Sequence, residues 1–276
     1  MVEGKADLHT HTIHSDGALS PLDLIAKAAS HGLAAISITD HDTVHAIEEL
    51  LPLDHQFKVE VIPGIELSAT YNGSEIHILG YFIDIHNKVL AESLATFREE
   101  RLKRVERIVG KLNRMNIPLT MESVLANAGN AAIGRPHVAT ALVHGGHAST
   151  YQQAFNKYIG EGRPAFEKKS PVSPQETVRL IAQAGGLSFL AHPGRLVDEA
   201  MLTHLIKCGL DGIEVVHPSH TPELVSYYRG IVSEYYLLES GGSDFHGGLK
   251  NDDQLFGQVC IPLSTVDVMR HRLFSQ

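Results

Sequence analysis

The chain has 276 residues, enough to bury one large α/β core or two smaller ones, and its 43% hydrophobic and 20% charged residues exclude a disordered or fibrous protein. Its formal net charge of −9, from 23 basic and 32 acidic residues, argues against a mainly basic nucleic-acid coat protein. No signal-peptide pattern and no run of membrane-spanning length is present, so we expect a soluble, cytoplasmic protein without membrane contacts.

The first expected strand carries the motif D-L-H-T-H at residues 7–11. Because side chains alternate along a strand, Asp7, His9 and His11 are expected on one face. Two neutral imidazoles side by side on a strand can share a metal ion, although a histidine-rich surface strand is the alternative. The following turn, H-S-D-G at 14–17, adds Asp16 as a further potential ligand.

Strands and helices alternate through most of the chain. Ser20-Pro21 is an N-cap followed by a proline at the first helical position, and that helix is expected to end at Gly32. Asn72-Gly73 marks an antiparallel hairpin with arms 67–71 and 75–83. Further strands are expected at 34–39, 59–65, 187–191, 212–216 and 236–239, and further helices from 43 onward and at 175–184, 198–207, 222–233 and 264–274.

The pattern changes between residues 98 and 168. Apolar residues at helical spacing form one stripe, and arginines and lysines crowd the other faces of the same helix. The stripe consists of Leu90, Leu94, Phe97, Val105, Ile108, Leu112 and Met115. Shorter helices are expected at 120–128, 134–145 and 150–159. We therefore predict a helical insertion domain, 98–168, within a catalytic barrel made of 1–97 and 169–276. A basic helix face is usually just solvated, and a nucleic-acid role is the alternative.

Potential ligands recur at the ends of the expected strands: His9, His11, Asp16, Asp40, His41, Asp42, Glu66, His192, Asp244 and His246, with His77 on the hairpin arm. An Asp after a strand is more often a helix cap, and a lone His more often a core residue. The carboxyl ends of parallel barrel strands open on one face, however, where these side chains would converge. So many coincidences favour a polynuclear metal site.

The chemistry of these ligands narrows the metal. His and carboxylate ligands without Cys suit Zn²⁺, Mn²⁺ or Fe²⁺. A carboxylate such as that of Glu66 can bridge two ions. Paired ions can convert a bridging water to hydroxide and neutralise phosphoryl oxygens, which suits hydrolysis of phosphate esters.

Seven motifs together resemble those of the PHP (polymerase and histidinol phosphatase) family: D-L-H-T-H (7–11), H-S-D-G (14–17), T-D-H-D (39–42), P-G-I-E (63–66), E-I-H-I-L-G (75–80), A-H-P-G-R (191–195) and G-S-D-F-H (242–246). The resemblance covers nearly the whole chain and implies an α/β fold, a distorted (β/α)7 TIM-like barrel carrying three divalent ions. It implies a first ion on His9, His11, Glu66 and Asp244, a second on Glu66, His77 and His192, and a third on Asp16, His41 and His246. Asp40 and Asp42 would then support the ligands, and Asp7 would orient a ligand histidine.

Within the family, H-S-D-G, the insertion and A-H-P-G-R resemble the bacterial branch that hydrolyses nucleoside 3′,5′-bisphosphates and trims nucleotides from RNA 5′ ends. The resemblance implies phosphate contacts from the R-x-H element, Arg135 and His137, and from Arg195, since a guanidinium fork suits phosphate oxygens. An ordinary surface ion pair is the alternative for both arginines. Lys157 and Tyr158 are further candidates for substrate binding.

The leading hypothesis is a metal-dependent phosphoesterase acting on a nucleotide or short RNA, with the insertion covering the active site. The expected catalytic residues are Asp244 and His192 at the metals and His220, which could contact substrate or donate a proton to the leaving group. One alternative is another phosphomonoesterase such as histidinol-phosphate phosphatase. Another is a metal-holding module without catalysis, like the inactive PHP domains of some polymerases. The sequence does not predict the native metal or the oligomeric state.

Overall fold

The protein is described by a computed structural model covering residues 4–129, 131–168, 172–195 and 199–274. The chain divides into two compact units, the first made of Met1–Glu92 and Pro171–Gln276 and the second of Ser93–Ser170. We call them the barrel unit and the helical unit. The second junction predicted from sequence, at 168/169, touches residues 169–171, which lie outside the described part.

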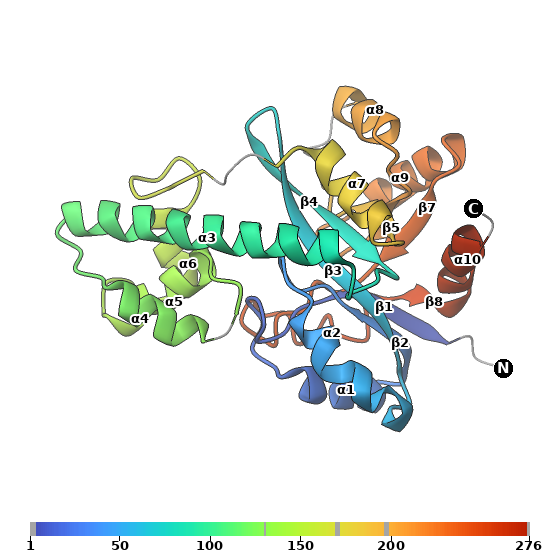
Figure 1. Cartoon of the computed structure of the whole chain (residues 1–276), viewed down its shortest axis with the longest axis horizontal. Coiled ribbons are helices and arrows are strands. Elements are labelled where there is room, and N and C mark those ends of the chain that lie inside the picture. The colour runs from blue at the N-terminus through green and yellow to red at the C-terminus, as the bar shows by residue number, and fades with distance from the viewer. Residues whose placement is uncertain (1–3, 130, 169–171, 196–198, 275–276) are drawn as a thin grey trace. The chain divides into compact units, whose positions relative to one another are not determined.

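One sheet of eight strands, nearly closed into a barrel, forms the centre of the barrel unit in the described residues (Figure 1). Its strands are β1 (Lys5–Thr10), β2 (Leu33–Ile38), β3 (Glu60–Tyr71), β4 (Ser74–Tyr81), β5 (Leu187–Leu190), β6 (Gly212–Val216), β7 (Leu238–Gly241) and β8 (Ile261–Pro262), in the order β7-β6-β5-β4-β3-β2-β1-β8. Neighbours pair in parallel except around the β3–β4 hairpin and at β8. The predicted distorted α/β barrel is confirmed. The antiparallel strand β4 of the hairpin interrupts the parallel order of the barrel strands.

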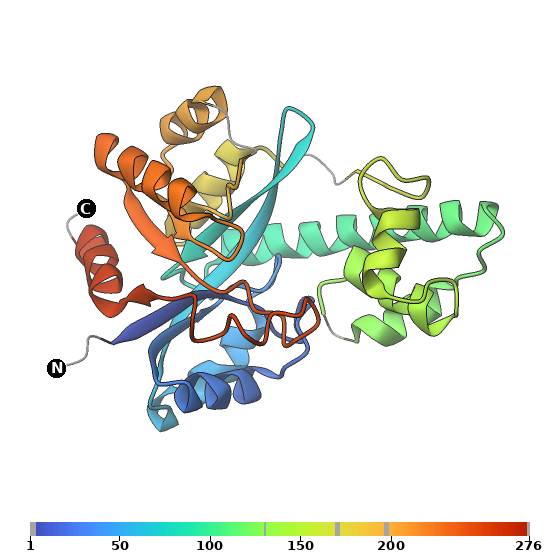
Figure 2. The same ribbon diagram turned by 180° about the vertical axis from the view of Figure 1, so that it is seen from behind.

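The segment after β7 closes the barrel at the carboxyl end of β1 (Figure 2). Thr10 forms a parallel bridge with Phe245, and the His11 N–H donates to the Phe245 carbonyl at 2.9 Å. A Cβ on Gly242 would overlap the backbone nitrogen of His9, so only glycine allows this approach. The result is that Asp244 and His246 lie beside the two histidines of β1.

Helices surround the strands of the barrel unit: α1 (Pro21–Ser30), α2 (His45–Leu50) with a 3-10 turn at Leu51–Gln56, α7 (Pro174–Gln183), α8 (Glu199–Lys207), α9 (Pro222–Glu234) and α10 (Leu263–Phe274). Local sequence explains where they begin. The Ser20 hydroxyl accepts from the Asp23 N–H at 3.2 Å, and Ser173 and Glu176 form a reciprocal capping box. The core of the barrel unit contains fully buried large side chains such as Leu8, Phe189 and Tyr81.

The helical unit has its own core. It contains most of α3 (Lys88–Arg114), then α4 (Met121–Ala128), α5 (Arg135–His144), α6 (Tyr151–Ala154) and a π-helical turn at Phe155–Ile159. The apolar stripe of α3 supplies Val105, Ile108 and Leu112 to that core, where they pack with Leu142 and Ile159. An independent core of this kind lets the unit fold as an insertion between β4 and β5.

The main differences from the expected strands concern β3 and β7, and β8 was not expected at all. β3 is one strand of 12 residues, so Glu66 lies within it rather than just past a strand end. The strand changes partner midway: Pro63 is its last residue paired with β2, and Gly64 is its first paired with β4. β7 begins two residues later than predicted, because Tyr236 has a left-handed backbone (φ 55°) that ends α9 rather than starting a strand.

Two further observations concern membrane-spanning helices and the cysteines. Among the helices of the described residues, none combines the length and apolarity that crossing a bilayer requires. Cys208 and Cys260 are both free and half-buried.

Candidate metal centre

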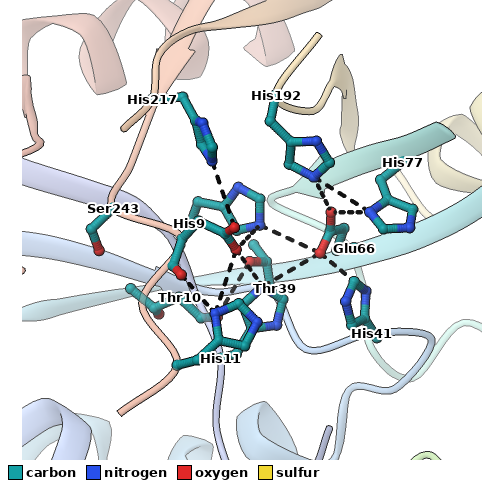
Figure 3. A network of polar contacts seen from close by, with 12 residues as sticks. His9, Thr10, His11, Thr39, His41, Glu66, His77, His192, His217 and Ser243 are labelled. Atoms are coloured by element: carbon teal, nitrogen blue, oxygen red, sulfur yellow. Dashed lines mark hydrogen bonds and ion pairs between the residues drawn. The ribbon is translucent and has the colours of Figure 1, made fainter. Parts of the chain in front are cut away.

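The carboxylate of Glu66 lies at the centre of a ring of imidazoles (Figure 3). Its Oε2 is 3.4 Å from His9 Nε2, 3.4 Å from His11 Nε2 and 3.0 Å from His41 Nδ1. Its Oε1 is 2.8 Å from His77 Nδ1 and 2.9 Å from His192 Nε2. Each oxygen thus faces a separate set of nitrogens, as a carboxylate shared between two cations would.

Asp244 and Asp16 extend this cluster on the β1 side. Asp244 Oδ1 lies 3.3 Å from His9 Nε2 and 3.2 Å from His11 Nε2. Asp16 Oδ1 lies 3.3 Å from His246 Nε2, 3.7 Å from His11 Nδ1 and 3.9 Å from His41 Nε2. The turn that places Asp16 depends on Gly17, whose Cβ would lie 2.5 Å from the His11 carbonyl oxygen.

All nine residues predicted as metal ligands therefore come together. They fall into four overlapping groups whose ligand atoms lie within 4.8 Å of one another: His11/Asp16/His41/His246, His9/His11/Asp244, His9/Glu66/His192 and His41/Glu66/His77. Residues shared between groups are what a polynuclear site requires. In this arrangement His11 belongs both to the group with Asp16 and to the group with Asp244.

Three buried nitrogens show that these residues fit divalent ions. His9 Nε2, His11 Nε2 and His41 Nδ1 are buried and have no hydrogen-bond partner within the described residues. Buried polar atoms are rarely left unsatisfied, and each of these three points at carboxylate oxygens. The other nitrogen of the His9 ring is already engaged, since His9 Nδ1 lies 2.8 Å from Glu214 Oε1, and His11 Nδ1 lies 3.4 Å from the Ser15 hydroxyl. An N–H donated on one side leaves a lone pair for a metal on the other.

The electrostatics of the cluster also favour cations. Burial opposes ionisation of Glu66, but the surrounding imidazoles, first that of His41, hold its pKa well below the ordinary value. Burial likewise lowers the pKa of His41, which favours its neutral, metal-binding form. Burial acts in the same sense on His9, but the neighbouring carboxylates, above all Glu214 and Glu66, raise its pKa well above the ordinary value. The carboxylates around His9 thus favour a positive charge at this position, and either a proton or a metal ion can supply it.

Glu214 is a functional residue that the sequence analysis missed. It is fully buried in β6, where Oε1 binds the His9 ring and Oε2 accepts the His192 N–H at 2.6 Å. The role of orienting a ligand histidine, which we predicted for Asp7, belongs to Glu214. A lone glutamate within the apolar strand G-I-E-V-V was the signal that could have revealed it.

Asp7 instead joins the ends of two strands. Its carboxylate accepts from the backbone N–H groups of His9 at 3.3 Å and Ser243 at 2.9 Å, and from the Ser243 hydroxyl at 2.6 Å. Complete burial raises the pKa of Asp7 to about 7, even though these hydrogen bonds act in the opposite direction. Asp7 therefore supports the backbone of the site rather than a ligand ring.

Other aspartates hold the ligand-bearing loops. Asp40 accepts from the Thr12 N–H at 2.7 Å and from the Ser15 hydroxyl at 2.5 Å, which positions the turn around Asp16. Asp42 accepts the Ser68 N–H at 3.0 Å, linking the His41 loop to β3. Asp252 accepts the His246 N–H at 2.5 Å. The supporting role predicted for Asp40 and Asp42 agrees with these contacts.

Two candidate ligands have strained backbones. His192 and Asp244 adopt positive φ angles of 28° and 51°. A non-glycine residue in this region costs about 1–3 kcal/mol, and such residues persist only where surrounding contacts impose them. The Glu214 bond to the His192 N–H and the Asp7 bonds to Ser243 are contacts of this kind.

A pocket of about 250 Å³ lies over the cluster, lined by His41, Glu66, His77, His192, His217, Ser219, Asp244 and Lys250. Lys250 Nζ is 2.7 Å from His246 Nε2 and 4.0 Å from Asp16 Oδ2, so it adds a positive charge at that end. The pocket is thus polar, strongly charged and large enough for a phosphate group. His217, Ser219 and Lys250 were not among the predicted site residues.

The residues predicted to bind substrate are spread over both units. Arg195 is exposed in the barrel unit, three residues after His192. In the helical unit, Arg135 lies over the rings of Phe155 (5.9 Å) and Phe166 (5.5 Å).

The remaining predicted contacts in the helical unit have structural partners. His137 is buried, with Nδ1 accepting the Gly134 N–H at the start of α5. Tyr158 is buried in the core of the unit, and its hydroxyl donates to the His147 carbonyl at 3.3 Å. Lys157 is exposed, with Nζ 4.9 Å from the Tyr158 ring.

The sequence and the structure are similar to those of known phosphoesterases. The profile described as the PHP domain matches residues 7–159. The 5′-3′ exoribonuclease Rnm of Escherichia coli is 33% identical over 249 residues, covering 87% of this chain and 84% of that protein. The 3′,5′-nucleoside bisphosphate phosphatase of Chromobacterium violaceum is 31% identical over 246 residues, covering 87% and 86%. A crystal structure from Bifidobacterium adolescentis, assigned as a metal-dependent phosphoesterase, superposes with a TM-score of 0.91 at 31% identity, covering 99% of this chain and 97% of that one.

Proposed function

This chain belongs to the PHP family and is a metal-dependent phosphoesterase, and from that premise we propose that its substrates are phosphate esters of nucleotides. The proposed substrates are nucleoside 3′,5′-bisphosphates, the 5′ ends of short RNA, or both. The observation that carries the proposal is the pocket over the Glu66 cluster, where carboxylates and imidazoles surround a space large enough for a phosphate group. Two relatives named for nucleotide chemistry, an exoribonuclease and a bisphosphate phosphatase, support the choice of substrate class.

We propose three divalent ions, Mn²⁺, Zn²⁺ or Fe²⁺, held as the family resemblance implies. The first would bind His9, His11, Glu66 and Asp244, the second Glu66, His77 and His192, and the third Asp16, His41 and His246. Such ions supply Lewis-acid chemistry, since they lower the pKa of water and neutralise phosphoryl oxygens.

The chain's own residues prepare the site for these ions and for the substrate. Glu214 fixes the His9 ring so that Nε2 points into the cluster, and it also holds the backbone of His192. Asp244 presents one oxygen to the β1 histidines, while its other oxygen faces the His217 side of the pocket. Lys250 and the exposed Arg195 add positive charge in the barrel unit, which suits an anionic substrate.

Arg135 of the helical unit is proposed as a second phosphate-binding arginine. The rings of Phe155 and Phe166 lie near its guanidinium, and this contact restricts the side chain. His137 and Tyr158 are buried and hydrogen-bonded within their unit, so we propose that they maintain the local structure around Arg135. We also propose that Lys157, which is exposed beside Tyr158, contacts the substrate.

The direct test is phosphate release from adenosine 3′,5′-bisphosphate with Mn²⁺, with chromatography of the nucleoside product. Release that yields 5′-AMP supports the bisphosphate phosphatase activity, and stepwise shortening of 5′-phosphorylated RNA supports the exonuclease activity. The Asp244→Ala variant serves as the metal-site control. Turnover of histidinol phosphate, or of a cyclic ribose phosphate, with neither nucleotide substrate cleaved would refute the nucleotide assignment. The cyclic substrate is included because a phosphoribosyl 1,2-cyclic phosphate diphosphodiesterase of Eggerthella lenta is 30% identical over 248 residues.

A further inference from the structure

His217 is a pocket residue with no role in the proposed metal set. It lies just after β6, and its side chain is 9% exposed. Figure 3 shows its ring directed toward the cluster from the side opposite His41. Its Nε2 is buried and has no hydrogen-bond partner within the described residues.

The contacts of Nδ1 decide where the proton on this ring lies. The backbone N–H of Ser219 donates to His217 Nδ1 at 3.1 Å, and the Ser219 hydroxyl lies 2.8 Å from the same nitrogen. A backbone N–H can only donate, so Nδ1 is the acceptor of the ring. In a neutral imidazole the proton is then on Nε2, the nitrogen that faces the pocket.

This N–H has no acceptor within hydrogen-bond distance. The nearest charged oxygen, Asp244 Oδ2, is 3.6 Å away, too far for a good hydrogen bond. Asp244 Oδ1, by contrast, faces the histidines of β1. A buried donor left unpaired costs about 1–3 kcal/mol, so an acceptor oxygen arriving in the pocket would gain from it.

His220, which we predicted to contact substrate, has the opposite arrangement. Its Nδ1 lies 2.9 Å from the Val215 carbonyl oxygen and must donate to it, and its Nε2 accepts the Gly194 N–H at 3.0 Å. Both ring nitrogens are engaged with backbone groups, so neither is available to a substrate. His220 therefore holds the His192–Arg195 loop against β6 and acts as a positioning residue.

We propose that His217, rather than His220, is the histidine that binds substrate: its Nε2–H donates a hydrogen bond to an oxygen of the phosphate group in the pocket. Ser219 makes this possible because its N–H keeps Nδ1 in the acceptor state. The inference rests on the proposed function and adds a fixed hydrogen-bond donor beside the cationic groups of the site. A donor already aimed at the reacting phosphate need not reorganise when charge develops there.

The test compares His217→Ala and His217→Gln in the metal-loaded enzyme, with His204→Ala as a surface-histidine control on α8 of the same unit. Three quantities are measured: kcat/KM for adenosine 3′,5′-bisphosphate, the inhibition constant of inorganic phosphate, and bound metal per chain. Loss of one such donor is expected to lower kcat/KM about 100-fold in His217→Ala. We expect phosphate inhibition to weaken and metal content to stay at the wild-type level. Gln places an amide N–H near the position of Nε2 and should restore part of the lost activity.

Two results would overturn the inference. Unchanged kcat/KM and phosphate inhibition in His217→Ala would mean that the ring does not touch substrate. Loss of metal together with activity would mean that His217 acts through Asp244 instead. Failure of the proposed function is recognised separately, since the wild-type enzyme would then release no phosphate from nucleotides at all.

Discussion

Replacing Glu214 by glutamine should weaken metal binding without altering a single ligand. In the wild-type protein the carboxylate accepts from both the His9 ring and the His192 backbone. A glutamine amide can keep the bond to the His192 N–H through its oxygen. Its NH2 group would then face His9 Nδ1, a donor opposite a donor.

The His9 ring resolves this conflict by moving its proton. Nδ1 becomes the acceptor, and the proton moves to Nε2, the nitrogen that faces Glu66 at 3.4 Å and Asp244 at 3.3 Å. A metal ion must displace this proton before it can bind. Loss of such a supporting partner typically costs about 10–100-fold in metal affinity, which is about 1.4–2.7 kcal/mol.

The assay is titration of the chelator-treated protein with Mn²⁺, followed by calorimetry and by recovery of phosphoesterase activity. Glu214→Gln should require about 10–100 times more Mn²⁺ than wild type. Glu214→Leu removes both acceptors and should also lower the free energy of unfolding by about 2–6 kcal/mol, because two buried donors lose their partner. Glu239→Gln on β7 is the matched control, since Glu239 pairs with the exposed Arg229 and such pairs contribute little.

Wild-type Mn²⁺ affinity in Glu214→Gln would refute this reasoning. It would show that the His9 tautomer does not depend on Glu214. A reduced affinity in Glu239→Gln of the same size would show that any change of charge near the sheet has this effect.

The remaining predictions concern the metals, the substrate and one helix. Asp244→Ala should lower turnover at least about 1000-fold with an unchanged circular dichroism spectrum, and an active variant would refute its place in the cluster. Mn²⁺ at 100 times its Kd should stabilise the folded protein by about 2.7 kcal/mol, and identical melting curves with and without Mn²⁺ would contradict metal binding. Arg195→Ala should raise KM about 10-fold with little change in kcat, and an unchanged KM would remove it from the substrate site. Ser173→Ala should cost about 1 kcal/mol in denaturant unfolding. Bonds from Ser173 lower the pKa of Glu176, so this cost should shrink as the pH falls through that pKa and persist at neutral pH.

Much of the architecture could be predicted because local patterns act over a few residues. Ser20-Pro21 and Ser173-Pro174 mark helix starts through cap bonds that the sequence itself supplies. Asn72-Gly73 marks the hairpin, because both residues tolerate the positive φ of its turn. The ligand-type residues lie where parallel strands end, and the barrel brings those ends together, so their convergence could be expected.

Glu66 shows the limit of this local reasoning. Sequence placed it after a strand, but it lies within β3, where the strand leaves β2 and pairs with β4. That exchange of partners depends on the whole sheet. It is also what turns the carboxylate toward histidines from β1 and β4 at the same time.

The hydrogen-bond partners were decided only by the tertiary structure. Glu214 rather than Asp7 orients His9, although Asp7 is two residues away in sequence and Glu214 is 205 residues away. His217 and His220 are equally plausible in the sequence V-H-P-S-H, yet one presents an N–H to the pocket and the other has both nitrogens bound to backbone. A sequence pattern specifies which residues can donate or accept. Which nitrogen carries the proton depends on the neighbour that the fold places beside it, because one donor facing a ring nitrogen is enough to fix the tautomer.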